Sequence, residues 1–359
     1  MILAGDIGGT KTHLALFEWK TERVGPIREE TFHSADYQSV EEILEEFLNR
    51  PAPEPSLPPE TDQPDSSGEA PVSAETEPRP PLVIDAACMG VAGPVIENRC
   101  RTTNLPWVID GPAIGDRFNI ANVRLLNDLE ATAYGILLLR EDEVFVLNPG
   151  TPPKQRQALV LIAAGTGLGE SILFWNGTHY QPMPSEGGHS DFAPNSDNEI
   201  ELLRHLRGSY LHVSYERVLS GPGLHAIYDY LRDTKKNEPT WLAEKIKVED
   251  PAATIAQAGL SGKVEIAKQA LDLFASIYGA EAGNLALTAL ALDGVYVGGG
   301  IAPKLIDKLK DGTFMRAFTN KGRYKRLMSA IPVKVVMNPK TGLLGAASVA
   351  GRMVAAGSP

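Results

Sequence analysis

The chain is poor in cysteine, in positive charge and in long apolar runs, and each shortage excludes a class of protein. The 359 residues include two cysteines, Cys88 and Cys100, too few for a disulfide framework or a four-cysteine zinc site. The net charge of −11 argues against broad nucleic-acid binding, which depends on phosphate neutralisation by Lys and Arg. No run approaches the ~18 apolar residues of a membrane span, and the first residues show no export signal. We therefore expect a cytoplasmic protein without nucleic-acid or membrane partners.

What remains is the composition of a globular chain, with 43% hydrophobic and 22% charged residues. Its length suits two domains. Alternating hairpins and helices predict an α/β class with two halves around a cleft. We expect a small domain from residues 1–138 and 339–359, and a large domain from 139–338. The proline-rich, acidic segment 51–81 has almost no large apolar residue, which predicts a flexible insertion.

The pattern of apolar residues and turns predicts the secondary structure. One helix is expected near 39–49, where Ser39 and Glu42 predict a capping box. Other helices are expected near 129–140 and 263–290 and from 343 onward. Strands are expected at 2–6, 12–18, 28–33, 82–88, 123–126, 143–147, 158–164, 170–175, 294–297 and 333–337.

A glycine-threonine turn between two strands occurs twice. The first copy is Gly8, Gly9 and Thr10, and the second is Gly165, Thr166 and Gly167. Glycine lets backbone N–H groups converge, and threonine adds a hydroxyl donor, so both suit a phosphate. One such turn is common in hairpins. Two predict a duplicated fold that holds a polyphosphate between its halves.

Two acidic positions stand beside these elements. Asp6 ends a strand directly before the first turn, where a carboxylate can hold Mg²⁺ directly or through water, or simply cap its own turn. Asp128 follows Asn127 between a strand and a helix. Asn and Asp are ordinary helix N-caps, but phosphoryl transfer to an alcohol also needs a carboxylate that accepts the hydroxyl proton.

A third polar group lies in the loop 185–194. Glu186, His189 and Asp191 fall within six positions, a density that suits a ligand with many hydroxyl groups. A metal site is the alternative, but no fourth ligand is close in sequence. Glu216 and the turn containing Gly299 and Gly300 are ambiguous from the residues alone.

Taken in order, these motifs resemble the bacterial glucokinase family, of the hexokinase and actin-like ATPase superfamily. The resemblance runs from Gly5 to Gly345, and it is densest at 165–169, 186–194 and 216–223. It implies a two-lobed actin-like ATPase (ribonuclease H-like) fold, with a duplicated sheet-and-helix core around a central cleft. Related repressor-like sugar kinases usually carry a cysteine-rich zinc motif, which two cysteines cannot supply.

The resemblance also implies roles for individual residues. Asp128 matches the catalytic base that activates the sugar 6-hydroxyl. Glucose would be bound by Asn127, Asp128, Glu186, His189 and Glu216. ATP would be bound by Asp6, Gly8, Gly9, Thr10, Gly165, Thr166, Gly167, Gly299 and Gly300, with Mg²⁺ at Asp6. The partners are then a hexose and ATP, and the protein is expected to be a homodimer.

The expected reaction is the ATP-dependent phosphorylation of D-glucose to D-glucose 6-phosphate. A kinase for mannose or fructose stays open, as do ADP and polyphosphate as donors. A sugar-sensing transcription regulator is disfavoured because only five residues precede Asp6, too few for a DNA-binding extension. The hydroxyl-binding cluster argues against an ATPase that acts on protein partners.

Overall fold

A computed structural model gives the fold, and most of the chain is described by it. The predicted insertion at 51–81 lies outside the described residues. Those that the structure describes are 1–18, 25–50, 82–235 and 237–357.

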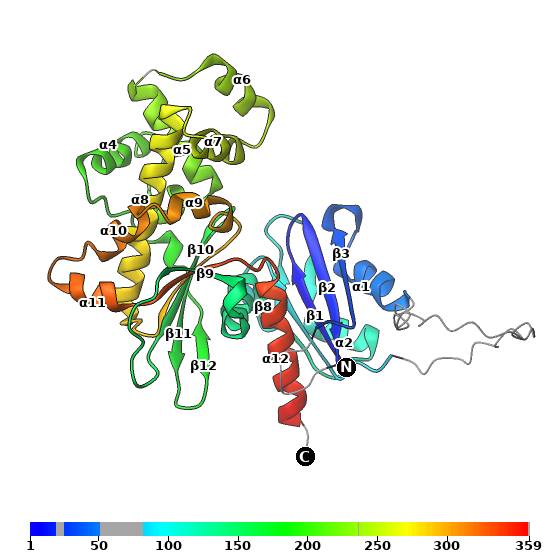
Figure 1. Ribbon diagram of the computed structural model, residues 1–359. Helices are drawn as coiled ribbons and strands as arrows, with labels where there is room; N and C mark the ends of the chain where they lie inside the picture. Colours follow the sequence, from blue (N-terminus) through cyan, green and yellow to red (C-terminus); the bar gives the residue numbers. More distant parts are fainter. Residues whose placement is uncertain (19–24, 51–81, 236, 358–359) are drawn as a thin grey trace, which may run out of the picture. The chain divides into compact units, whose positions relative to one another are not determined.

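The chain divides into two compact units (Figure 1). Unit 1 contains Met1–Asp128 and Ala346–Pro359, and unit 2 contains Leu129–Gly345. The chain passes from one to the other at the start of helix α3 (Asp128–Gly135) and within helix α12 (Thr341–Gly357).

The main sheet of unit 1 has five strands in the order β3-β2-β1-β4-β8. The first three pair antiparallel, whereas β1, β4 and β8 run parallel. A smaller sheet has the order β5-β6-β7. The strands are β1 (Ile2–Ile7), β2 (Lys11–Phe17), β3 (Arg28–His33), β4 (Ala86–Val91), β5 (Val95–Ile96), β6 (Arg99–Arg101), β7 (Val108–Asp110) and β8 (Val123–Asn127).

Helix α1 (Val40–Asn49) packs against this sheet because its apolar residues recur on one face. Val40, Ile43, Leu44 and Phe47 are fully buried in one cluster with strand residues such as Leu3. Each buried side chain of this size contributes about 1.5–3 kcal/mol. Ile114 of helix α2 (Gly111–Phe118) joins the same cluster.

Unit 2 repeats this strand arrangement. Its sheet has the order β12-β11-β10-β13-β14-β9. Strands β10, β11 and β12 pair antiparallel, and β10, β13 and β14 run parallel, with β9 antiparallel at the edge. The strands are β9 (Val144–Asn148), β10 (Leu159–Ala164), β11 (Leu168–Trp175), β12 (Tyr180–Met183), β13 (Gly294–Gly298) and β14 (Val333–Val336).

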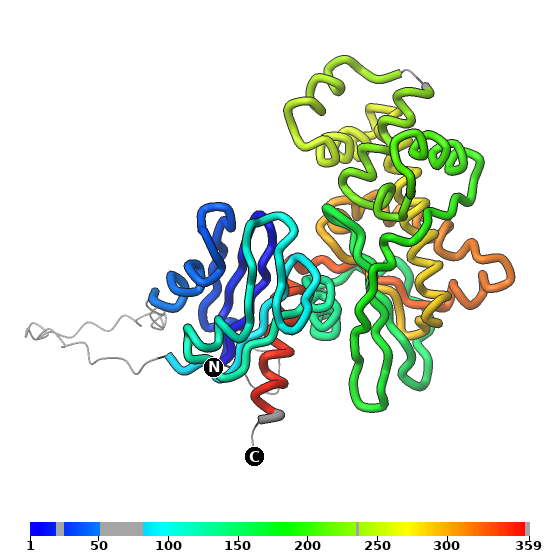
Figure 2. Tube along the Cα trace, turned by 180° about the vertical axis from the view of Figure 1, so that it is seen from behind, coloured from blue at the N-terminus to red at the C-terminus, as the bar shows by residue number. Residues whose placement is uncertain are grey.

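The two glycine-threonine turns therefore occupy equivalent places. Residues 8–10 join β1 to β2, and residues 165–167 join β10 to β11, in each case before the strand that pairs antiparallel. Figure 2 follows both hairpins along the chain, the first in blue and the second in green. The predicted duplicated α/β core is confirmed.

Helices make up most of the rest of unit 2. They are α4 (Asp197–Leu206), α5 (Gly221–Lys235), α6 (Thr240–Val248), α7 (Pro251–Leu260), α8 (Glu265–Ala289), α9 (Ile306–Leu309), α10 (Thr313–Thr319) and α11 (Lys325–Ala330). Short 3-10 helices are η1 (Ser34–Asp36), η2 (Ile136–Leu138), η3 (Glu141–Glu143), η4 (Gly187–His189), η5 (Tyr215–Arg217), η6 (Pro303–Leu305) and η7 (Gly322–Tyr324).

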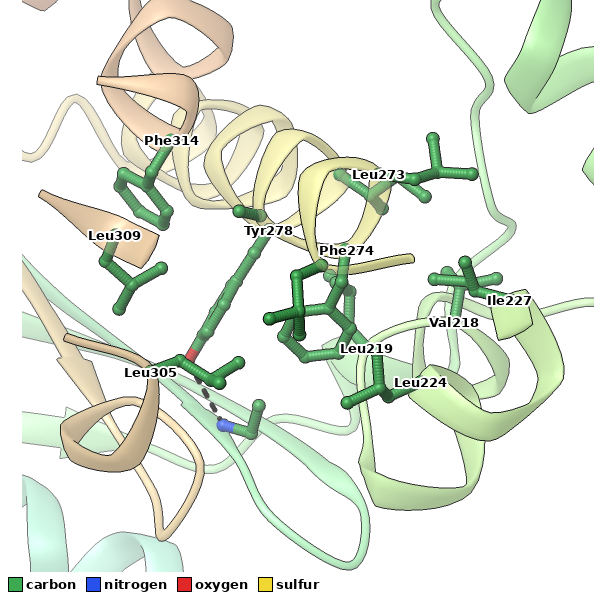
Figure 3. Close-up of a cluster of buried hydrophobic side chains, with 14 of the residues drawn as sticks. Val218, Leu219, Leu224, Ile227, Leu273, Phe274, Tyr278, Leu305, Leu309 and Phe314 are labelled. Carbon is green, nitrogen blue, oxygen red and sulfur yellow. Dashed lines mark hydrogen bonds between the residues drawn. The ribbon is translucent and has the colours of Figure 1, made fainter. Parts of the chain in front are cut away.

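Helix α8 is the centre of the unit 2 core. Nearly every residue from Leu273 to Ala286 is buried, and the helix packs against α5, α7 and α10. Figure 3 shows Tyr278 of α8 between Phe314 and Phe274. The ring centroid of Tyr278 lies 5.7 Å from that of Phe314 and 5.9 Å from that of Phe274, and both ring pairs pack edge to face. Aromatic pairs prefer this geometry.

Two local predictions were wrong. The predicted strand 82–88 begins at Ala86, and Leu82 and Val83 are exposed, because the neighbouring strand β1 begins at Ile2, opposite Ala86. The predicted capping box does not form. The side chain of Ser39 makes no capping hydrogen bond, and Glu42 instead accepts the backbone N–H of Gln38 at 2.8 Å.

Cys88 and Cys100 are both buried as free thiols. Within the described ranges, no helix is long and apolar enough to cross a membrane.

The contact of α8 with α10 gives a testable prediction. In an isolated helix, Gly→Ala stabilises by about 1 kcal/mol. At Gly279, however, an added Cβ would collide with the carbonyl oxygen of Phe314. We expect Gly279→Ala to lower the free energy of unfolding by about 1–3 kcal/mol, the usual cost of overpacking, measured by urea denaturation.

The control for this variant is Thr288→Ala, at an exposed position of the same helix. It should change the unfolding free energy by no more than about 0.5 kcal/mol. A Gly279→Ala protein as stable as the unmodified chain would contradict the close helix contact.

Candidate functional site

In unit 1, the predicted phosphate turn and the predicted base lie at one edge of the sheet. Parallel pairing places Ile7, Val91 and Asn127 in one row, at the carboxyl ends of β1, β4 and β8. The turn 8–10 follows the first of these strands and Asp128 follows the third. Open α/β sheets bind their ligands at this edge.

Asp6 and Asp128 are close enough to interact electrostatically. Burial raises the pKa of the Asp6 carboxyl to about 6, and the negative charge of Asp128 raises it in the same direction. Asp128 itself is exposed. The side-chain amide of Asn127 donates to the carbonyl oxygen of Gly93 at 3.1 Å, which fixes the end of β8 beside the end of β4.

The first turn is packed tightly beneath Asn104. A Cβ at Gly9 would lie 2.8 Å from the Cβ of Asn104, so only glycine fits there. The N–H of Gly8 donates to the carbonyl oxygen of Lys11 at 2.9 Å. That N–H is therefore used within the turn.

In unit 2, the second turn and the glycine turn after β13 share an edge in the same way. Strand β10 pairs in parallel with β13, with Ala163 opposite Gly298. Residues 165–167 and 299–300 therefore leave neighbouring parallel strands at the same end. Gly299 has a φ of +80°, and a Cβ there would collide with the backbone of Ala164.

The second turn is joined to Glu216. The N–H of Leu168 donates to Glu216 Oε2 at 3.0 Å, and a Cβ at Gly167 would lie 2.5 Å from the same oxygen. The N–H of Gly165 donates to the carbonyl oxygen of Gly167, and that of Gly221 to the carbonyl oxygen of Gly165, both at 2.8 Å. Glu216 thus belongs structurally to the phosphate turn as well as to the polar cluster.

The turns differ from the prediction in one respect. None of the four glycines has positive φ. Gly9 and Gly167 are required for close approach to Asn104 and Glu216, whereas a Cβ at Gly165 would meet no atom within 4 Å. The N–H groups of Gly8 and Gly165 are hydrogen-bonded within the turns. In the described chain, the N–H groups of Thr166 and Gly167 make no hydrogen bond to protein atoms, and these can bind a ligand.

The predicted hydroxyl-binding residues come together in unit 2. His189 Nε2 lies 3.9 Å from Glu186 Oε2, and His189 Nδ1 lies 4.0 Å from Glu216 Oε1. These separations exceed a hydrogen bond, and all three side chains reach solvent. Apart from Glu216 Oε2, which accepts the N–H of Leu168, their polar atoms are not hydrogen-bonded to one another and can reach the hydroxyl groups of a ligand.

Asp191 has a different partner from Glu186, the other acidic residue of its loop. Its Oδ1 lies 2.8 Å from Nε2 of His212, a residue that the sequence did not single out. Among the described residues, no group of three or more His, Cys, Asp and Glu side chains could hold a metal ion.

Tyr278 is a site residue that sequence reasoning missed. Its fully buried hydroxyl accepts the N–H of Ala164 at 3.2 Å and lies 3.3 Å from the carbonyl oxygen of Gly298. Figure 3 shows it reaching from α8 to this backbone. It ties together the ends of β10 and β13, from which both turns leave. The only sequence signal is a hydroxyl in an otherwise apolar helical stretch.

The structure thus groups the predicted site residues into two sets. The set in unit 1 contains Asp6, Gly8, Gly9, Thr10, Asn127 and Asp128. The set in unit 2 contains Gly165, Thr166, Gly167, Glu186, His189, Glu216, Gly299 and Gly300.

Comparison with known proteins decides the family. A family model described as Glucokinase matches residues 3–353. The chain belongs to the glucokinase family. The glucokinase of Nostoc punctiforme is 38% identical to it, over 98% of this chain and 99% of the relative. That of Synechocystis sp. is 41% identical, over 96% of each.

A solved structure has the same fold as this glucokinase-family chain. The crystal structure of a glucokinase from an Antarctic psychrotroph matches with a TM-score of 0.79 and 28% sequence identity, covering 98% of each chain. The duplicated sheets with their parallel and antiparallel pairings are those of the predicted actin-like ATPase fold. The fold class and the family are both confirmed.

Tyr278 gives a prediction for the site. Tyr278→Phe leaves the N–H of Ala164 buried without its acceptor, which costs about 1–3 kcal/mol of unfolding free energy. Because both glycine turns leave the strands that this hydroxyl joins, we also expect weaker ATP binding, measured by calorimetry.

Tyr228→Phe is the matched control, because Tyr228 is equally buried but its hydroxyl donates to Glu238 at 2.9 Å. It should lose stability without a change in ATP affinity. If the two variants bind ATP equally well, Tyr278 has no influence on the turns.

Proposed function

We propose that the protein transfers the γ-phosphoryl group of ATP to the 6-hydroxyl of D-glucose. Membership of the glucokinase family supports the reaction. The observation that carries the assignment of roles is the row of strand ends in unit 1, which sets Asp128 at the same edge as the turn 8–10. A base and a phosphate-binding turn are what phosphoryl transfer to an alcohol requires.

Asp128 acts as the general base. It is exposed, so a substrate hydroxyl can reach it. Its carboxylate accepts the proton of the 6-hydroxyl as the oxygen attacks the γ-phosphorus in line, and the bond to the β-phosphate oxygen breaks. Asn127, which is fixed by its bond to Gly93, presents its carbonyl oxygen to a neighbouring sugar hydroxyl.

The remaining sugar hydroxyls are bound by Glu186, His189 and Glu216. Support comes from the separations of 3.9 and 4.0 Å between them, which show that these three side chains do not hydrogen-bond to one another at the atoms measured. A carboxylate accepts and an imidazole can donate, so the set suits vicinal hydroxyl groups. Glu216 also bonds Leu168 beside the second phosphate turn.

The phosphates of ATP are held by the two turns, 8–10 and 165–167. The N–H groups of Thr166 and Gly167 are aimed at no protein acceptor in the described chain, which suits an anion. Gly299 and Gly300 are exposed and share an edge with the second turn, so the adenosine is assigned there.

The residues of unit 1 fit a magnesium ion. Asp6 is a half-buried carboxyl near the charge of Asp128, and its desolvation and that charge both raise its pKa. A cation at this position would stabilise the ionised carboxylate of Asp6 against both effects. Mg²⁺ keeps several waters and needs only one or two carboxylates in addition to substrate phosphates, so a cage of three ligands is not required. When bound, the ion neutralises the phosphate charge.

Several finer statements stay predictions. They are the domain division at 1–138 with 339–359 and 139–338, the homodimer, the cytoplasmic location, and the choice of glucose over mannose and fructose. The choice of ATP over ADP and polyphosphate can be tested with a panel of hexoses and donors. Absence of hexose-dependent phosphoryl transfer with every donor would overturn the proposed function.

The role of Asp128 gives the third prediction. Asp128→Asn keeps the size of the side chain but removes the proton acceptor. We expect kcat to fall by at least ~10²-fold, the lower end of general-base contributions, while ATP affinity and the unfolding transition stay unchanged. Steady-state kinetics with a coupled assay measures the change.

Asp191→Asn is the control, because Asp191 is paired with His212 and not with the hydroxyl-binding set. It should retain kcat within a few-fold of the unmodified protein. Near-normal turnover of Asp128→Asn would remove Asp128 from its role and leave the family assignment intact.

A further inference from the structure

Two glutamates are buried beneath the proposed sugar-binding residues. Glu170 is on β11 and Glu281 is on α8, with exposed fractions of 3% and 5%. The two carboxyl groups interact, and burial together with the charge of Glu281 raises the pKa of Glu170, which favours a proton on this side chain. Charged residues are almost never buried unless they are paired, and neither glutamate belongs to the site described above.

Glu170 contacts the segment that carries Glu186 and His189. Its Oε2 lies against Gly187 so closely that an added Cβ would collide with it. Gly188 packs in the same way on the backbone of Leu168. Within the described residues, no N–H or hydroxyl group donates to the buried Oε1 of Glu170. A proton shared with Glu281 can satisfy this side chain.

Glu281 contacts the segment that carries Glu216. The hydroxyl of Tyr215, which is the preceding residue in η5, donates to Glu281. The amide of Asn284 donates to Glu281 Oε2 at 2.8 Å and to the hydroxyl oxygen of Tyr215 at 3.0 Å. The carboxyl pair therefore connects η4 and η5 through the interior of unit 2.

The positive charge near the two glutamates is enough to compensate one carboxylate and not two. Lys321 interacts with Glu281, and its Nζ donates to Ala280 O at 2.8 Å and to Asn284 Oδ1 at 2.6 Å. The other titratable groups that face the pair are the hydroxyls of Tyr215 and Tyr278, and burial raises the pKa of both. They stay neutral, so a second carboxylate charge would be uncompensated.

We propose that the proton shared by Glu170 and Glu281 positions Glu186, His189 and Glu216 for sugar binding, which makes the two glutamates positioning residues for the proposed glucose site. The inference rests on the proposed function. Loss of the proton to solvent breaks the O–H bond and leaves two adjacent carboxylates. Their repulsion acts on Gly187 and Tyr215, the contacts that hold the two sugar-binding segments.

The electrostatics fix the direction of the pH dependence. Burial raises the pKa of Glu170 from 4.5 to about 8, and the charge of Glu281 and the hydrogen bond between the carboxyls act in the same direction. The native state therefore keeps a proton that the unfolded chain loses. Stability is highest below about pH 4.5 for this group and falls as the pH rises through about 8.

The test is the pH dependence of glucose binding. If only the protonated pair holds the site, the KM for glucose rises about tenfold between about pH 7 and about pH 9. The KM for ATP does not change over the same range, because the pair contacts the sugar-binding segments. Glucose binding measured by calorimetry without nucleotide should weaken by the same factor.

Glu170→Gln separates positioning from simple packing. The amide donates to Glu281 at every pH, so this variant should bind glucose as the unmodified protein does at neutral pH and lose the rise at high pH. Glu199→Gln is the matched control. Glu199 of α4 is also buried, at 4% exposure, but it accepts the backbone N–H of Asn195, which precedes the helix. The control should keep the pH profile of the unmodified protein.

A second variant covers the case in which Glu170→Gln does not fold. Glu281→Gln leaves a single carboxylate, which can accept a hydrogen bond from the new amide, so this variant should also lose the rise in KM for glucose at high pH. A pH profile identical in all variants would overturn the positioning role.

The outcomes separate this role from the proposed function. Glucose binding without phosphoryl transfer would contradict the proposed reaction, and the calorimetric pH profile would still decide the role of the pair. Failure to bind glucose at any pH would overturn both.

Discussion

The arrangement of this site depends on the parallel pairing at the centre of each sheet. In unit 1, β1, β4 and β8 end in one row, and in unit 2, β10 and β13 end together. Parallel strands bring all their carboxyl ends to one edge, so a short turn after each strand is enough to gather distant segments. Residues 8–10 and Asp128 therefore lie at one edge of the first sheet, and residues 165–167 and Gly299 lie at one edge of the second. The duplication repeats one arrangement of strand ends and turns on two sheets.

In unit 2, direct contacts connect the proposed sugar-binding residues to the turn 165–167. Glu216 bonds the backbone of Leu168 directly after the turn, Tyr278 joins the ends of the strands that lead into it, and Glu170 supports Gly187 from below. A change in any of these contacts reaches both the proposed sugar side and the proposed phosphate side. The buried carboxyl pair adds a proton to these contacts, which makes the arrangement sensitive to pH.

The sequence predicts the duplicated fold because each turn follows an apolar strand. Its position between a strand and a helix makes Asp128 a candidate, and the resemblance to the glucokinase family implies its role as the base. The sequence does not predict the roles of Tyr278 or Glu170, since their importance comes from contacts between β11, α8 and η4 that are distant in the chain. The capping box at Ser39 was wrong because Glu42 reaches Gln38 instead. Local patterns identify the groups that meet a ligand, and tertiary packing determines the groups that hold them.

The central claim is that the chain transfers the γ-phosphoryl group of ATP to the 6-hydroxyl of glucose. The most direct measurement is nuclear magnetic resonance of the products formed from glucose labelled with carbon-13 at C6. The account predicts glucose 6-phosphate, recognised by phosphorus coupling at the labelled carbon, in amounts equal to the ADP formed. Release of free phosphate without a sugar phosphate, or phosphorylation at another hydroxyl, would contradict it.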